Sequence, residues 1–233
     1  MRKLNLVLGL FVIVGSIGFV SCKKGNGKII TSEKEVSSFE EVHLSSSADV
    51  YYHESQQYRA VVTVDENLLD QVEIKTKGNE LHIGTKKGNH SFTKFVVDVY
   101  SPHITKASIS GSGNFECTDK IVVPTFEATI SGSGNLKGIV ECDDFSARIS
   151  GSGDITIVGV AENSTINISG SGDFKGREFK TNNANVQISG SGDARVWVTD
   201  YLNARISGSG DIIYRGTPRI DFNGSGSGRV KSE

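Results

Sequence analysis

The hexapeptide Ile-Ser-Gly-Ser-Gly-Asn at residues 109–114 decides the fold, because it recurs through the second half of the chain. Five further copies end in Asn or Asp, and a seventh, Phe-Asn-Gly-Ser-Gly, is altered. Successive copies start 16 to 21 residues apart. In chain order, the later copies begin at Ile130, Ile149, Ile168, Ile188, Ile206 and Phe222. Internal repeats of this length indicate a solenoid of stacked units.

An alternating segment precedes each copy of the hexapeptide. Before Ile130, the apolar residues Phe126 and Ala128 alternate with the polar residues Glu127 and Thr129. A period of two with one apolar face is typical of a strand that buries one side. A second short strand is expected after each copy. One unit therefore contains two short strands joined by a glycine-rich corner.

A unit of about 19 residues has no core of its own and must bury its apolar face against the next unit. We therefore predict an all-β, parallel β-helix-like solenoid with coils of about 19 residues over residues 105–233, in which equivalent residues stack about 4.8 Å apart. Glycine is expected at the corners because it permits positive φ and lets neighbouring corners approach closely. Nineteen of the 27 glycines lie at or after Gly111, so the two halves of the chain differ.

Residues 29–104 lack the glycine corners but are also rich in predicted strands, and Glu66 to Leu69 is expected to form one helical turn. The segment Leu44 to Asp49, Leu-Ser-Ser-Ser-Ala-Asp, resembles a worn corner in which Ser46 and Ala48 replace the glycines. It precedes the corner at Ile109 by about three repeat lengths. We predict irregular coils or a β cap that continues the same fold.

The first 21 residues read as an export signal rather than as part of the fold. Two basic residues precede an apolar stretch, Leu4 to Val20, and Ser21-Cys22 follows it. This pattern predicts a lipoprotein signal peptide over 1–21 that is cleaved before Cys22, leaving that cysteine acylated. An ordinary secretory signal and an uncleaved anchor are the alternatives. Residues 22–28, with three lysines and two glycines, are predicted to form a flexible tether.

The formal net charge of −2 indicates no excess of basic residues that could bind nucleic acid. Removal of residues 1–21 would leave a net charge of −4. An oxidising envelope would permit a disulfide between Cys117 and Cys142. Their positions relative to the repeats fall in different columns, so two buried thiols are the favoured interpretation.

The chain also resembles a known family. An acylation signal, a strand-rich region and repeated I-S-G-S-G-[ND] corners are similar to the auto-transporter adhesin family with a head GIN domain, whose members are envelope proteins common in Bacteroidetes. The resemblance implies a right-handed β-helix-like fold on an exported, lipid-anchored protein. In the strand-rich region it rests on Phe39, Ala48-Asp49-Val50, Asn67-Leu68-Leu69 and Leu81-His82-Ile83.

The acidic residue that closes four of the corners is the first candidate site. If the corners stack, these carboxylates line one edge, with Asn114 and Asn135 at the equivalent positions of the first two copies. They could close the turns by accepting hydrogen bonds from turn amides, or they could bind a hard cation such as calcium. Turn closure is the favoured interpretation, because Asn serves the first two copies equally well. The four carboxylates are those of Asp154, Asp173, Asp193 and Asp211.

A second candidate is the outward column of the strands that precede the corners. Its polar side chains would form a face for glycan or protein binding, or else a solvated sheet surface. The column lacks the acidic cluster and poised base that a polysaccharide lyase needs. Beyond Thr129, it comprises Arg148, Asn167, Gln187 and Arg205.

No nucleophile elbow, phosphate loop or CxxC pair is present, and the five histidines have no metal-ligand spacing. We therefore expect no catalytic residue, metal or cofactor, and no nucleic-acid partner. The expected function is that of a non-enzymatic, adhesin-like envelope lipoprotein, anchored to the outer membrane by lipid and binding a glycan or protein. The alternative is a structural or assembly role in the periplasm, with copies joined into a homo-oligomer, and a polysaccharide-active enzyme is least favoured.

Overall fold

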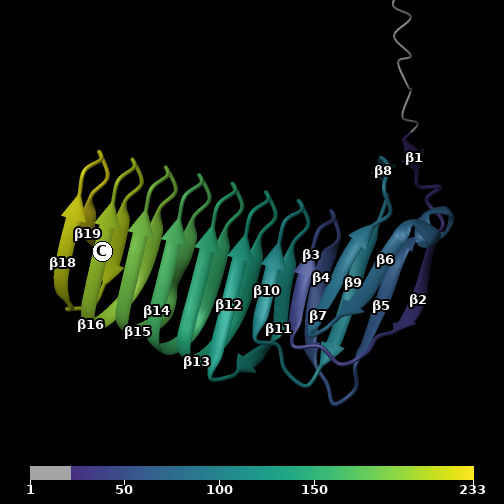
Figure 1. Ribbon diagram of the computed structural model, residues 1–233, viewed down its shortest axis with the longest axis horizontal. Coiled ribbons are helices and arrows are strands. Elements are labelled where there is room, and N and C mark those ends of the chain that lie inside the picture. The colour runs from purple at the N-terminus through teal and green to yellow at the C-terminus, as the bar shows by residue number, and fades with distance from the viewer. Residues whose placement is uncertain (1–21) are drawn as a thin grey trace, which may run out of the picture.

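The computed structural model describes residues 22–233, and the predicted signal peptide lies outside the described residues. Figure 1 shows a row of parallel coils that leads into a more irregular β region at the N-terminal end. Apart from one two-stranded pair, all strands belong to a single 17-stranded sheet. Within residues 22–233, no helix is long and apolar enough to cross a membrane.

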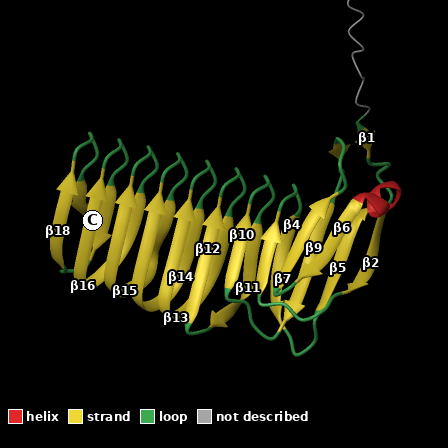
Figure 2. Cartoon of the chain, viewed as in Figure 1, coloured by secondary structure: helices red, strands yellow, loops and turns green. Residues whose placement is uncertain are grey.

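Stacked coils of the predicted length confirm the β-solenoid over the second half of the chain (Figure 2). Every strand of this part pairs in parallel with the equivalent strand of the next coil, for example Ile149 with Ile168 and Ile168 with Ile188. The strands are β10 (Lys106–Ile109), β11 (Phe115–Val122), β12 (Thr125–Ile130), β13 (Leu136–Ile149), β14 (Ile155–Ile168), β15 (Phe174–Ile188), β16 (Ala194–Ile206), β17 (Ile212–Arg215), β18 (Arg219–Gly224) and β19 (Val230–Ser232).

Each coil contributes two strand segments to two layers of the solenoid. The segment that ends at a corner lies in the layer that we call the leading layer, and the segment that starts after a corner lies in the trailing layer. The long strands β13 to β16 supply both, because they bend between the layers, as near Gly159, which has a φ of 123°. Inward side chains of both layers, such as Ile149 and Ile155, are fully buried and form one continuous core.

The corner glycines do not adopt the positive φ that we expected. Glycines with positive φ occur elsewhere, as at Gly159 and Gly216, and none of them belongs to a corner. The close approach of neighbouring corners is the physical reason for glycine. A Cβ atom added to Gly151 would lie 1.9 Å from the carbonyl oxygen of Gly132 in the preceding coil, well inside van der Waals contact.

The seventh corner lies two residues later than its sequence suggested. Strand β18 pairs Ala204 with Phe222 and Ile206 with Gly224. Phe222 therefore continues the column of Ala204, and the true corner runs from Gly224 to Gly228. Glycine replaces the usual isoleucine at its start, which obscured the alignment.

The worn corner at Leu44 to Asp49 is the first corner of the stack, directly beside the corner at Ile109. Strand β3 (Glu41–Leu44) pairs Leu44 with Ile109, and β4 (Asp49–Glu54) pairs Val50 with Phe115. The chain between the two corners therefore forms no intervening coils. It folds instead as a cap that closes this end of the solenoid.

Of the two structures expected for the N-terminal part, irregular coils or a β cap, the protein has the cap. The cap and the solenoid belong to one continuous sheet. Antiparallel pairings join β2 to β5, β5 to β9 and β6 to β7, while β7 and β9 continue the two layers in parallel beside β3 and β4. A short 3₁₀ helix covers residues Glu66–Gln71, where a helical turn was predicted. The cap strands are β2 (Ile29–Glu35), β5 (Arg59–Asp65), β6 (Val72–Lys77), β7 (Glu80–Thr85) and β9 (Phe95–Ser101).

Residues 23–28 are docked onto the cap, unlike the flexible tether expected from their composition. Strand β1 (Lys23–Lys24) pairs in parallel with β8 (His90–Ser91). The buried carboxylate of Asp65 accepts hydrogen bonds from the backbone N–H groups of Gly27, at 2.9 Å, and Thr93, at 2.7 Å. These partners lie in the cap, far away in sequence, so composition alone could not reveal them.

Candidate functional site

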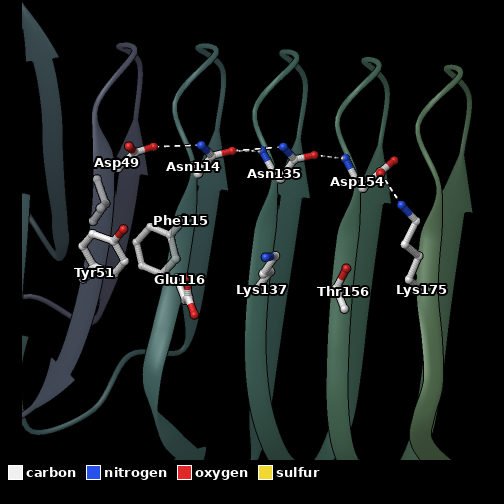
Figure 3. A pocket seen from close by; sticks show the side chains of 11 residues that line it. Asp49, Tyr51, Asn114, Phe115, Glu116, Asn135, Lys137, Asp154, Thr156 and Lys175 are labelled. Carbon is white, nitrogen blue, oxygen red and sulfur yellow. Dashed lines mark hydrogen bonds and ion pairs between the residues drawn. The ribbon is translucent and has the colours of Figure 1, made fainter. Parts of the chain in front are cut away.

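The side chains that close the corners form a hydrogen-bonded ladder along one edge of the solenoid (Figure 3). Each Oδ1 atom accepts the backbone N–H of the equivalent residue in the next coil, as when Asp173 N donates to Asp154 Oδ1 at 2.9 Å. The same bond joins Asn114 to Asn135 at 3.2 Å and Asp193 to Asp211 at 2.8 Å. We expected acceptance from turn amides. The amide that donates belongs to the corner of the next coil, because each side chain points along the stack.

The second carboxylate oxygen of several ladder residues faces a cation. Asp154 Oδ2 lies 2.5 Å from Lys175 Nζ, and Asp211 Oδ2 lies 2.5 Å from Lys231 Nζ. Partial burial alone would raise the pKa of Asp154, but the Lys175 ammonium and the Asp173 N–H outweigh it and hold that pKa below its ordinary value. These partners favour the turn-ladder interpretation over a cation site. Among residues 22–233, no group of three or more His, Cys, Asp or Glu side chains could hold a metal ion.

The ladder predicts a difference between two substitutions at Asp173, which has no ion-pair partner among the described residues. Asp173→Ala removes the acceptor of the Asp193 N–H and should lower the free energy of unfolding by about 1–2 kcal/mol. Asp173→Asn keeps an oxygen at that position and should change it by less than about 0.5 kcal/mol. Urea unfolding with and without calcium measures both. Stabilisation by calcium that Asp173→Asn abolishes would show a cation site instead.

The predicted outward column lies in the leading layer as one row. Strand register places Arg148, Asn167, Gln187 and Arg205 directly beside one another on successive coils. Asn167 is half-buried and the other three are exposed. Towards the cap, the row continues through His43 and His82. The imidazole rings of these two histidines stack 5.3 Å apart.

Sequence reasoning missed a second row, in the trailing layer beneath the ladder, where the surface is hollowed into a groove (Figure 3). Register places Tyr51, Glu116, Lys137 and Thr156 on four successive coils, two residues after each corner-closing residue. Tyr51 and Thr156 are half-buried, while Glu116 and Lys137 are exposed. Asp49 lies at the upper end of the groove, where its Oδ1 accepts a hydrogen bond of 2.8 Å from Asn114 Nδ2.

The functional groups in this groove are available to a ligand. Within residues 22–233, no hydrogen bond or ion pair engages the side chains of Tyr51, Glu116, Lys137 or Thr156. An aromatic ring, a carboxylate, an ammonium and a hydroxyl therefore converge on one concave surface without internal partners. Convergent polar groups of this kind are typical of ligand sites. Nothing in the arrangement pairs a nucleophile with a base.

The other candidate groups have ordinary environments. Cys117 and Cys142 are buried thiols rather than a disulfide, and Cys22 is an exposed thiol. Burial, helped by Asp143 and Asp144, raises the pKa of Cys142 to about 12, so this thiol is unreactive at neutral pH. The Trp197 ring is covered by the Arg215 guanidinium at 4.2 Å. An indole ring covered in this way offers little surface for stacking against a ligand.

A capped parallel β-solenoid with polar outer rows and a shallow groove defines a class of repeat proteins that present an extended surface to a partner. More specifically, the chain belongs to the family described as "Putative auto-transporter adhesin, head GIN domain", whose model matches residues 38–218. Membership suggests association with the cell envelope.

Solved structures agree with this assignment. A protein of Parabacteroides distasonis described as a putative lipid binding protein is 27% identical, with a TM-score of 0.77, and the match covers 91% of this chain and 100% of that one. A putative adhesin of the same species is 28% identical, with a TM-score of 0.76 and the same coverage. A putative adhesin of Bacteroides fragilis, 21% identical with a TM-score of 0.84 over 90% and 99% of the chains, shares the fold. Family and neighbours are named as adhesins or binding proteins rather than enzymes. No curated protein matches the sequence.

Proposed function

We propose that this protein is a lipid-anchored envelope protein that binds a glycan in the groove formed by Tyr51, Glu116, Lys137 and Thr156. The convergence of these unpartnered side chains carries the proposal. A half-buried tyrosine ring supplies an apolar face for a sugar ring, and the carboxylate, ammonium and hydroxyl can exchange hydrogen bonds with sugar hydroxyls. The charged lining suits a glycan better than an acyl chain, although one relative is described as lipid binding. The protein acts by binding and not by catalysis.

Two matched tyrosines make the proposal testable. Tyr51 lies in the groove, and Tyr201 is another half-buried tyrosine, on the outer face of the leading layer in the row of Asn163 and Asn183. On a panel of surface and dietary glycans, Tyr51→Ala should weaken binding at least about tenfold, a loss of about 1.4 kcal/mol. Tyr201→Ala should leave it unchanged. Urea unfolding checks that both variants are folded.

The same panel separates the groove from the row predicted from the sequence. A loss of binding in the double variant Arg148→Ala/Arg205→Ala, with Tyr51→Ala unaffected, would transfer the site to the leading layer. Absence of binding by the unmodified protein to the whole panel and to cell-surface extracts would refute the glycan proposal. It would favour the alternative of a structural or assembly role, which self-association at high concentration would support.

We further propose that acylation of Cys22 anchors the protein to the outer membrane. Cys22 is exposed at the start of the described chain, beside β1. Metabolic labelling with a palmitate analogue, lost in Cys22→Ser, tests the anchor. Protease treatment of intact cells, with a periplasmic control protein, tests on which side of the outer membrane the protein lies. Degradation while the control survives indicates a surface adhesin, whereas protection until the outer membrane is opened indicates a periplasmic role.

A further inference from the structure

The lysines of the N-terminal end are concentrated on two segments that the fold brings together. Residues 22–28 and 86–94 contain six lysines and no acidic residue, and all six lysines are exposed. Strands β1 and β8 join the segments, with Lys23 beside His90 and Lys24 beside Ser91. Figure 1 shows this pair projecting from the cap. We call this surface the basic end, with Lys23, Lys24, Lys28, Lys86, Lys87 and Lys94 as its charged residues.

The charge of the basic end contrasts with that of the rest of the molecule. Lys28 pairs with Glu66 at 2.7 Å, and Lys23 and Lys86 lie close enough to Asp70 to help lower its pKa, after a hydrogen bond from Gln71. The buried carboxylate of Asp65 also lies against these segments, and Lys86 helps to lower the pKa of Glu73, after Lys75. Even with these four acids counted, the basic end carries a net charge of +2. The remaining residues from 22 onwards comprise 17 basic and 23 acidic side chains, a net charge of −6. The protein therefore has one cationic end and an anionic body.

Docking of residues 23–28 fixes the basic end beside Cys22. A free tether of seven residues could extend about 25 Å, which is three times the Debye length of about 8 Å at physiological salt. The observed segment cannot extend in this way, because Asp65 bonds to Gly27 and Thr93, and Asn67 Nδ2 donates to the Lys24 carbonyl at 2.9 Å. A group attached to Cys22 therefore remains within screening distance of the lysines.

We infer that the basic end is a docking surface for the anionic phospholipid headgroups of the membrane that holds the anchor. Ammonium groups near such a surface are attracted to it, whereas the anionic body is repelled. Both effects act in the same direction and hold the solenoid away from the bilayer, with its groove exposed to solvent. The orientation rests on the proposed acylation of Cys22, but the attraction between the basic end and the headgroups does not.

Vesicle partitioning tests the surface without the anchor. Protein consisting of residues 22–233 should bind vesicles of equal parts phosphatidylglycerol and phosphatidylcholine, and it should not bind pure phosphatidylcholine. Binding should disappear at about 1 M salt, where the Debye length falls to about 3 Å. Inorganic phosphate at the same phosphate concentration should compete no better than chloride at equal ionic strength. Stronger competition would identify a small-anion site and overturn the inference.

Two triple variants with the same change in net charge provide the decisive comparison. Lys86→Gln/Lys87→Gln/Lys94→Gln should weaken partitioning about 100-fold, since each lysine near an anionic surface contributes roughly fivefold. Lys106→Gln/Lys120→Gln/Lys180→Gln, on the solenoid, should stay within about twofold. Equal loss in the two variants would show a net-charge effect, and no binding by the unmodified protein would also overturn the inference. Palmitate labelling of Cys22 is independent of both results, so failure of the surface is distinguishable from failure of the anchor.

The orientation of the protein on the membrane can be measured separately through the fluorescence of Trp197, the only tryptophan in the sequence. Trp197 lies on β16, which is far from β1 in Figure 1. Cys22 is the only exposed thiol among the described residues, so a maleimide lipid should couple there alone. On anionic vesicles carrying a dansyl lipid, energy transfer from Trp197 should be lower in the unmodified protein than in the Lys86/Lys87/Lys94 variant. Equal transfer in the two proteins would contradict a role of the basic end in orientation.

Discussion

Gly151→Ala is expected to destabilise the protein by at least about 3 kcal/mol, at or beyond the upper end for overpacking. The added Cβ would lie 1.9 Å from the Gly132 carbonyl oxygen, and the obstacle is backbone that cannot move aside as a side chain would. Displacing the corner would also break the hydrogen bond of 3.1 Å from Ser152 N to the Gly132 carbonyl. Because each coil is held by its neighbours, a gap here separates the stack into two parts. Urea unfolding measures the loss.

The serine beside this glycine provides the control. Ser152 is exposed, and no hydrogen bond engages its side chain within residues 22–233. Ser152→Ala should therefore change the free energy of unfolding by less than about 0.5 kcal/mol. A Gly151→Ala variant as stable as the unmodified protein would show that successive corners can separate, and it would refute close approach as the reason for glycine.

The worn corner supports this reasoning from within the sequence. Ser46 and Ala48 carry the Cβ atoms that the later corners exclude, and both side chains are buried. They fit because the preceding strand in the layer, β7, ends at Thr85 and is followed by no corner of this type. The first corner of a stack is therefore free of the restriction that its successors obey.

Repetition explains why so much of the fold could be predicted from the sequence. Alternation before each corner identified the inward column, and the structure places Ala147, Ile166 and Val186 in it as expected. Both close approach and positive φ were predicted as reasons for glycine at the corners, but the sequence could not show which of them applies, since both favour the same residue. The seventh corner was misplaced because its first residue is Gly224, which carries no side chain to align.

The candidate groove could not be predicted from the sequence, because it depends on the pairing of two strands, β4 and β11, that are far apart along the chain. Tyr51 and Glu116 are far apart in the sequence and become neighbours only because the cap folds back between their strands. Had the worn corner been aligned directly with that at Ile109, Tyr51 would have fallen in the same column as Glu116 and Lys137. The outward row that contains Arg148 could be predicted from the sequence, because its members are one repeat apart along the chain.

Phe145→Ala is the second substitution with a large expected effect, a loss of about 3–5 kcal/mol in the free energy of unfolding. Phe145 is 2% exposed, and its ring centroid lies 4.8 Å from that of Phe179 and 5.9 Å from that of Phe174. In its column it stands between Phe126 and Ser164. We attribute the contact with Phe179, two coils later, to the small Ser164 side chain between them.

Removal of this ring leaves a cavity that the neighbouring coils cannot easily close, because their backbones are fixed by parallel hydrogen bonding on both sides. The loss would equal a large part of the free energy of unfolding of a whole domain, which is typically roughly 5–15 kcal/mol. Val160→Ala is the matched control, since Val160 is 44% exposed on the outer surface, and it should cost less than about 1 kcal/mol. A loss below about 1 kcal/mol for Phe145→Ala would show that this part of the solenoid collapses around the missing ring. The core would then depend on the stacking of backbone coils more than on its aromatic cluster.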